Sequence, residues 1–240
     1  MDTLIARILQ ESGYRENPYF AALNDGSLSR EDFLETQIQF YFAVIFFSRP
    51  MAAAAAKIPH PRERVEVLRN VWEEHGEGNV SVMHGETFLE LLNRLGGVTI
   101  EDVHMRSLWP EVRAFNTTLV GACVLDEYVI GIGALGMIER MFVDISRWIG
   151  RGIVQRGFLS EERLIHYKLH EQLDVRHSED FFTVLRPLWE HSAEDKYYIE
   201  QGFRLGAYIF NRLYEDLYRS RGRRVLCGGH GREGLHTRVR

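Results

Sequence analysis

Apolar residues recur every three or four positions along most of this chain, and proline occurs only six times in 240 residues. That spacing places apolar side chains on one face of an α-helix, whereas a half-buried β-strand needs strict alternation. No repeat of roughly 20 to 50 residues is visible, which argues against a helical solenoid. We therefore expect an all-α protein, built as a compact bundle of about seven to eight helices.

Start and stop signals place the individual helices. Ser29 and Asp32 have the spacing of a capping box, so a helix begins there. It runs to Arg49, and Pro50 marks a kink or a restart before an alanine-rich stretch. Glycines and prolines separate the later helices. These are expected over residues 62–75, 80–95, 101–109, 111–123, 125–149, 160–188 and 193–219.

Charge is distributed unevenly between the body of the chain and its end. Residues 219–240 hold seven arginines and one acid, a net charge of +6, which leaves −11 for residues 1–218 within the formal total of −5. An acidic body repels a phosphate backbone, so nucleic acid is not an expected partner. The length and the 45% hydrophobic content suit one globular domain, residues 1–218. The Gly- and Arg-rich residues 219–240 are expected to form a disordered tail.

Cysteine content and the amino-terminal segment indicate the compartment. Cys123 and Cys227 are too few for a disulfide framework or a cysteine-rich metal site, and a reducing cytoplasm suits them. The first 18 residues become charged and polar before a secretory segment could be completed, and no later stretch offers 18 uncharged apolar residues. The sequence thus predicts a cytoplasmic protein with no membrane partner.

The segment from His170 to His177 carries the most informative polar residues. Asp174 and His177 follow His170 by four and seven positions, so on a helix the three share one face in a stripe about 10 Å long. If that face is buried, each polar group needs its own partner, and metal ligation would satisfy all three together. A solvated polar face is the alternative that this triplet alone leaves open.

Two further segments contain candidate ligands. Glu139 is the one acid in the otherwise apolar run 129–139, where a carboxylate needs a partner or a metal; an ion pair with Arg140 or an exposed helix edge is the alternative. Residues 73–84 hold acids and a histidine around glycines that weaken a helix: Glu73, Glu74, Glu77 and His84. Three helices would thus supply nitrogen and oxygen donors suited to iron or manganese, and their number suits two metals better than one.

Together these segments resemble the haem-oxygenase-like diiron oxidases, which share their fold with TenA- and PqqC-like proteins. That family is marked by E-x-G-x-G followed by a histidine, by a later glutamate, and by H-x3-D-x2-H. Residues 74–78 with His84 are similar to the first mark, the run ending at Glu139 to the second, and residues 170–177 to the third. The resemblance covers residues 20–218.

The resemblance implies a non-haem diiron enzyme that activates dioxygen as its co-substrate. Two Fe(II) ions, with manganese as an alternative, would bind without haem or flavin. Family members desaturate, fragment or N-oxygenate amino acids, or decarboxylate fatty acids, so a small carboxylate- or amine-bearing substrate in natural-product or cofactor biosynthesis is implied. The resemblance is also compatible with an external electron donor and with a homodimer. The implied ligands are Glu74, His84, Glu139, His170, Asp174 and His177.

Glu77 is a further candidate ligand. The family pattern favours Glu74, which lies 10 residues before His84, or about 15 Å along a straight helix, so the helix must bend or unwind there. Glu77 lies seven residues before His84 and would share its face on an unbroken helix.

Other interpretations of the sequence stay open. A metal-independent enzyme of the same fold could use Cys123 as a nucleophile, as thiaminase-like relatives do, although a lone buried cysteine is usually inert. A metal-binding scaffold without a substrate cavity is the non-catalytic alternative. For an enzyme, the candidate substrate contacts are residues that could pair with a carboxylate or that lie on an early helix: Arg49, Lys168, Arg176, Gln37 and Tyr41.

Overall fold

The computed structural model describes residues 1–164 and 166–227, with residues 168–173 described by their backbone alone. Within this part the chain is all-α, as predicted, with no strand. Ten α-helices occur there rather than about seven to eight, because the amino-terminal α1 and α2 add to the expected set. They are α1 (Asp2–Glu11), α2 (Pro18–Asp25), α3 (Arg30–Lys57), α4 (Pro61–Glu74), α5 (His84–Gly96), α6 (Ile100–His104), α7 (Pro110–Val124), α8 (Tyr128–Gln155), α9 (His166–His191) and α10 (Ala193–Arg219).

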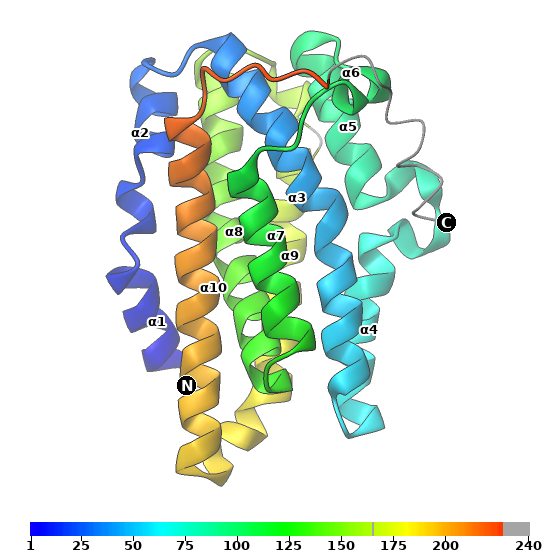
Figure 1. The fold of residues 1–240 in the computed structure, drawn as a ribbon, viewed down its shortest axis with the longest axis vertical. Coiled ribbons are helices and arrows are strands. Elements are labelled where there is room, and N and C mark those ends of the chain that lie inside the picture. The colour runs from blue at the N-terminus through cyan, green and yellow to red at the C-terminus, as the bar shows by residue number, and fades with distance from the viewer. Residues whose placement is uncertain (165, 228–240) are drawn as a thin grey trace.

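The long helices run side by side along the long axis of the molecule (Figure 1). α1 and α2 lie against α10 on one side, and α4 and α5 lie against α3 on the other. The apolar α8 packs against α7, α9 and α10, so it forms the centre of the bundle. A residue in the middle of α8 is therefore surrounded by other helices.

Glycines let the helices around α8 approach closely. A Cβ added at Gly206 of α10 would lie 2.4 Å from the carbonyl oxygen of Ala134, and one at Gly136 would lie 2.9 Å from Phe181 of α9. Real Cβ atoms do not come so near, so only glycine fits at these two positions. α8 is thus held tightly between α9 and α10, and Glu139 follows Gly136 by one turn into the bundle interior.

α3 starts at the predicted capping signal and continues as one helix past Arg49, the expected end of the first run, to Lys57. Ser29 Oγ accepts a hydrogen bond of 3.0 Å from the Asp32 amide, and Pro50 stands inside the helix without ending it. By length and composition α3 could cross a membrane, but 61% of its most apolar window is buried inside the bundle. A buried core helix meets the same criteria, so packing accounts for its apolar character.

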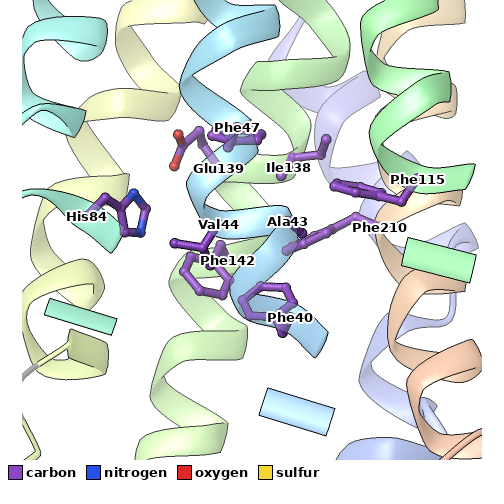
Figure 2. Close-up of a pocket in the computed structure, with 10 residues that line it drawn as sticks. All are labelled: Phe40, Ala43, Val44, Phe47, His84, Phe115, Ile138, Glu139, Phe142 and Phe210. Carbon is purple, nitrogen blue, oxygen red and sulfur yellow. The ribbon is translucent and has the colours of Figure 1, made fainter. Parts of the chain in front are cut away.

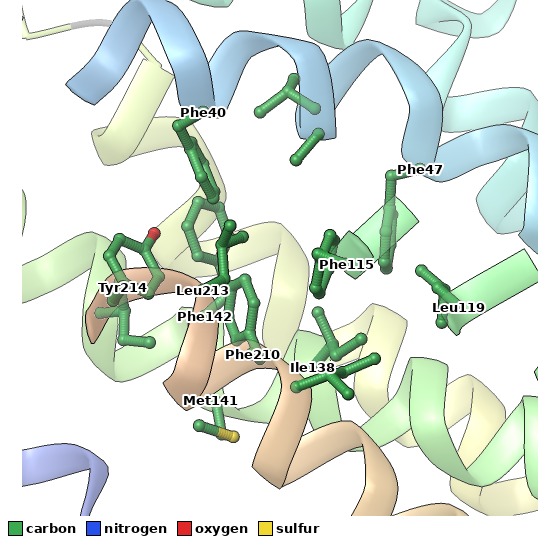
Figure 3. Packing of buried hydrophobic residues seen from close by; sticks show 14 of the residues in the cluster. Phe40, Phe47, Phe115, Leu119, Ile138, Met141, Phe142, Phe210, Leu213 and Tyr214 are labelled. Carbon is green, nitrogen blue, oxygen red and sulfur yellow. The ribbon is translucent and has the colours of Figure 1, made fainter. Parts of the chain in front are cut away.

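Aromatic rings from four helices form the core on the α10 side of α8 (Figure 3). Phe142 lies 5.8 Å from Phe40 of α3 and 5.9 Å from Phe210 of α10, measured between ring centroids, and Phe210 lies 6.0 Å from Phe115 of α7. These tilted and edge-on pairs give a rigid apolar wall.

The segment after α10 packs on the bundle. The Ser107 amide donates to the Val225 carbonyl at 2.9 Å, and the Cys227 amide donates to the Met105 carbonyl at 2.8 Å. Arg223 pairs with Glu111 at 2.9 Å and Arg224 with Asp32 at 2.6 Å, so the basic residues are held by acids of the body. The disordered tail expected from residue 219 is therefore wrong for residues 219–227, while residues 228–240 lie outside the described part of the chain.

Candidate metal centre

The break between α4 and α5 brings two of the predicted ligands together. Glu74 is the last residue of α4 and His84 is the first residue of α5. Gly76, Glu77 and Gly78 between them have positive φ angles of 62°, 52° and 88°, which reverse the chain direction. As a result, Glu74 Oε2 and His84 Nδ1 are hydrogen-bonded although they stand ten residues apart. The bend that this spacing required is present.

Glu77 lies exposed at the outside of this bend. Its assignment as a candidate ligand rested on an unbroken helix reaching His84, and the helix is broken by the glycines on either side of it. The structure thus contradicts that assignment and turns Glu74 inward instead, with 6% of its surface exposed.

Three helices each contribute one donor to a buried cluster. Ligand atoms of Glu74 from α4, Glu139 from α8 and His177 from α9 all lie within 4.8 Å of one another. Asp174, one turn before His177, adds a carboxylate: its Oδ1 lies 3.9 Å from His177 Nδ1, which is itself 4.0 Å from Glu139 Oε1. With His84 joined through Glu74, five of the six predicted ligands meet here. Metal binding by these five residues is a prediction.

The sixth predicted ligand, His170, and the predicted substrate contact Lys168 lie outside the described side chains. Both belong to the helical backbone of α9.

The pKa values of two carboxyl groups and one histidine in this cluster are raised above their ordinary values. Burial raises the pKa of Glu139 well above its usual value, and the nearby Asp174 and Glu74 raise it further. Burial also raises the pKa of Asp174 well above its usual value, although His177 and His84 oppose this. Burial lowers the pKa of His84, but the charge and hydrogen bond of Glu74 outweigh burial, so this pKa rises. A cation among these donors would relieve the repulsion between the carboxylates.

Two residues without an assigned role in the sequence stand beside the cluster. Glu73 Oε2 accepts a hydrogen bond of 2.7 Å from His177 Nε2. His166 is fully buried, and its ring stacks on that of His84 with the centroids 5.0 Å apart. Thr87 Oγ1 lies 3.1 Å from His166 Nδ1, which ties this histidine to α5.

An apolar pocket adjoins the cluster (Figure 2). Its cavity volume is about 40 Å³, and it is lined by Phe40, Ala43, Val44, Phe47, His84, Phe115, Ile138, Glu139, Phe142 and Phe210. His84 and Glu139 face it from one side, and Phe115 and Phe210 close the opposite side. Neither lysine nor arginine is among these lining residues. The polar part of the wall therefore consists of two predicted ligands.

The two predicted arginine contacts do not reach this pocket. Arg49 is exposed on α3, with its guanidinium 5.6 Å from the ring centre of Phe46. Arg176 is half exposed and forms an ion pair with Glu73. Both assignments to a substrate carboxylate are therefore wrong for this pocket, because each side chain leaves its helix on the side facing solvent.

Gln37 and Tyr41 are buried but also lie outside the pocket lining. The Gln37 amide donates to the Tyr19 hydroxyl at 2.7 Å and accepts from the Tyr167 hydroxyl, so its polar groups are used in a structural network. Tyr41 packs its ring against Phe88, with the centroids 6.2 Å apart. Neither is placed to contact a molecule in the pocket.

Comparison with known proteins identifies the class to which this fold and site belong. Residues 34–210 match the family described as iron-containing redox enzymes. The match spans most of the chain, so the protein belongs to this family and is an oxidoreductase of that class.

Relatives and solved structures agree with this assignment. The chain is similar to 4-aminobenzoate synthase of Chlamydia trachomatis, 24% identical with 78% of this chain and 80% of the relative covered. It is also similar to 4-aminobenzoate synthase of Nitrosomonas europaea, 23% identical with 74% and 75% covered. Among solved structures, a haem-oxygenase-like protein of unknown function from Shewanella denitrificans gives a TM-score of 0.74 at 15% identity, covering 91% of this chain and 90% of that one. A CADD-like protein from Nostoc punctiforme gives 0.74 at 14% identity, with 91% and 97% covered. The haem-oxygenase-like fold is thus confirmed.

Proposed function

We propose that this protein is a non-haem diiron oxidase or oxygenase that uses dioxygen to oxidise a small substrate with an apolar body. The observation that carries the proposal is the buried cluster of Glu74, Glu139 and His177 beside an apolar pocket. Carboxylate and imidazole donors suit iron or manganese, and thiolates, which favour zinc or iron–sulfur clusters, are missing from this group.

The donors present fit a dinuclear iron site. Glu139 and Asp174 are buried carboxyl groups whose pKa values are raised well above the ordinary range by burial, and a bound cation would lower them again. Glu74, His84, Glu139, Asp174 and His177 would hold the metals, with His170 as the predicted sixth ligand. When bound, iron supplies the redox and oxygen chemistry that amino-acid side chains cannot perform.

The residues of the chain itself define how a substrate would lie. Phe40, Phe115, Phe142 and Phe210 exclude water and would enclose an apolar body. Because neither lysine nor arginine is among the lining residues that the structure describes, a carboxylate or amine on the substrate would turn toward the end of the pocket formed by His84 and Glu139. This end-on arrangement places the polar end of the substrate next to the metals.

The named relatives support a biosynthetic role. Proteins called 4-aminobenzoate synthase are similar over three quarters of this chain, and a pocket with phenyl walls accommodates aromatic as well as aliphatic bodies. We place the activity in natural-product or cofactor biosynthesis in the cytoplasm, with an external electron donor supplying any electrons that the substrate does not.

The alternative based on a cysteine nucleophile has little support in the structure. Cys123 is fully buried on α7, and burial raises the pKa of its thiol to about 12. Gly131 packs so closely against it that an added Cβ would lie 2.9 Å from Cys123 Cα. A thiol in this position stays protonated and is out of reach of the pocket.

Narrowing the pocket tests its role in substrate binding and separates the enzyme from a metal-binding scaffold. Ala43→Leu would fill space beside the phenyl walls, and overpacking of this kind costs about 1–3 kcal/mol, so the apparent affinity for substrate is expected to fall roughly tenfold or more. Iron content should not change, because Ala43 touches none of the predicted ligands in the described contacts. The measurement is dioxygen consumption by the iron-loaded protein with a panel of amino, aromatic and fatty acids.

Ala56→Leu is the matched control, since Ala56 lies exposed near the end of the same helix. If Ala43→Leu and Ala56→Leu had the same apparent affinity for the substrate, the pocket would not be the place where it binds. Dioxygen consumption that no compound in the panel stimulates in the wild-type protein would favour the scaffold.

A further inference from the structure

Two consecutive acids at the end of α4 serve different partners. Glu74 points into the donor cluster and bonds His84, whereas Glu73 bonds the outer nitrogen of His177. Glu73 has 9% and His177 1% of its side chain exposed, so this contact is largely shielded from water. Hydrogen bonds to a charged group in such surroundings are strong and well oriented.

The contact fixes which nitrogen of His177 carries the proton. A carboxylate can only accept, so the Nε2 atom that lies 2.7 Å from Glu73 Oε2 must be the protonated nitrogen. In the neutral ring, Nδ1 then holds the lone pair. Nδ1 has no hydrogen-bond partner in the described part of the chain and faces Glu139 and Asp174 at 4.0 and 3.9 Å. A lone pair that faces two acidic side chains in this way is the donor arrangement that a bound cation would use.

α4 also holds the backbone that carries this ring. Asn70 Nδ2 donates to the His177 carbonyl at 3.2 Å, one turn before Glu73 on the same helix. Arg176 forms an ion pair with Glu73 from the solvent side. The ring and the backbone of His177 are thus both held by α4.

We infer that Glu73 is a positioning residue of the metal centre, which orients His177 so that Nδ1 faces the metal. The inference rests on the proposed function, because it assigns His177 as a ligand. Partners of this kind, which hydrogen-bond the far nitrogen of a ligating histidine, raise its basicity and fix its ring. Glu73 itself bonds the Nε2 side of the ring and would act on the metals only through His177.

The test compares metal binding by metal-free full-length protein under anaerobic conditions, with Fe(II) for affinity and Co(II) for its absorption bands. Glu73→Ala is expected to weaken binding by about 10–100-fold and to shift the Co(II) bands, whereas Glu73→Gln, which keeps an acceptor oxygen, should recover part of the affinity. Glu66→Ala is the matched control: it removes another carboxylate of α4 that pairs with an arginine, Arg69, but touches no histidine in the described contacts.

Affinity within about twofold of the wild type in Glu73→Ala would overturn the inference, whatever happens to its thermal stability. So would a Glu73→Gln variant that binds no better than Glu73→Ala, because the acceptor oxygen is the feature that the inference assigns. A wild-type protein that takes up no Fe(II) would overturn the proposed function and the inference with it.

Discussion

Replacing Glu139 with glutamine is expected to stabilise the metal-free protein at neutral pH while strongly weakening iron binding. Burial, with Asp174 and Glu74 nearby, raises the pKa of Glu139 well above its ordinary value. A neutral amide of the same shape cannot ionise, so the variant avoids the cost of keeping this group protonated in the fold at neutral pH. Relief of a buried charge conflict is worth roughly 1–4 kcal/mol, or about 2–4 °C of melting temperature per kcal/mol in a chain of this size.

The sign of the pH dependence follows from the raised pKa. The unfolded chain releases the Glu139 proton near pH 4, about the ordinary value for glutamate, whereas the folded chain retains it to higher pH. The wild type is therefore penalised increasingly as pH rises from the unfolded pKa to the folded pKa. Melting curves of both proteins should coincide near pH 4 and separate toward neutral pH, with the variant more stable.

Glu90→Gln is the control for this comparison, since Glu90 is an exposed carboxylate paired with Arg94. It should change the melting temperature little at any pH. A Glu139→Gln protein that is less stable than the wild type at neutral pH, or a difference that does not vary with pH, would contradict the account of a carboxylate held for a cation.

The second large effect is expected when Fe(II) is added anaerobically to the metal-free wild type: the folded state should become more stable. Ligand at about 100 times its dissociation constant stabilises the folded state by roughly 2.7 kcal/mol, so a rise of about 5–10 °C in melting temperature is expected. Metal binding must displace protons from Glu139 and Asp174, whose raised pKa values keep them protonated in the metal-free state. Stabilisation should therefore be larger near pH 8 than near pH 6, and unbuffered protein should release protons on addition.

Mg²⁺ at the same concentration serves as the control for nonspecific screening, because it prefers oxygen donors and keeps its waters. Two outcomes would argue against a site of mixed imidazole and carboxylate donors. One is an equal rise in melting temperature with Mg²⁺, and the other is a rise with Fe(II) that is the same near pH 6 and near pH 8.

The spacing of the polar residues was enough to predict most of the site. Asp174 and His177 share a face of α9, and Glu139 stands inward because the run around it is apolar. The bend before His84 was predicted from the family resemblance, which favoured Glu74: 10 residues of straight helix would have separated the two by about 15 Å. Helix geometry alone favoured Glu77 instead.

Other features depend on tertiary packing that the sequence does not encode locally. Which of the adjacent acids Glu73 and Glu74 turns inward depends on where α4 ends against α9. His166 had one local signal, its offset of four from His170, but its stacking on His84 depends on how α5 meets α9. Arg49 and Arg176 fit a carboxylate by residue type, and only the assembled bundle shows that they face solvent.

The most direct test is an anaerobic Fe(II) titration of metal-free wild type beside His177→Ala, with bound iron counted per chain. His191→Ala is the control, because His191 is exposed at the end of the same helix and pairs with Asp195. We expect about two irons per wild-type and control chain, and the loss of most of this uptake in His177→Ala. No specific uptake by the wild type, or equal uptake by His177→Ala, would contradict a diiron centre at Glu74, Glu139 and His177.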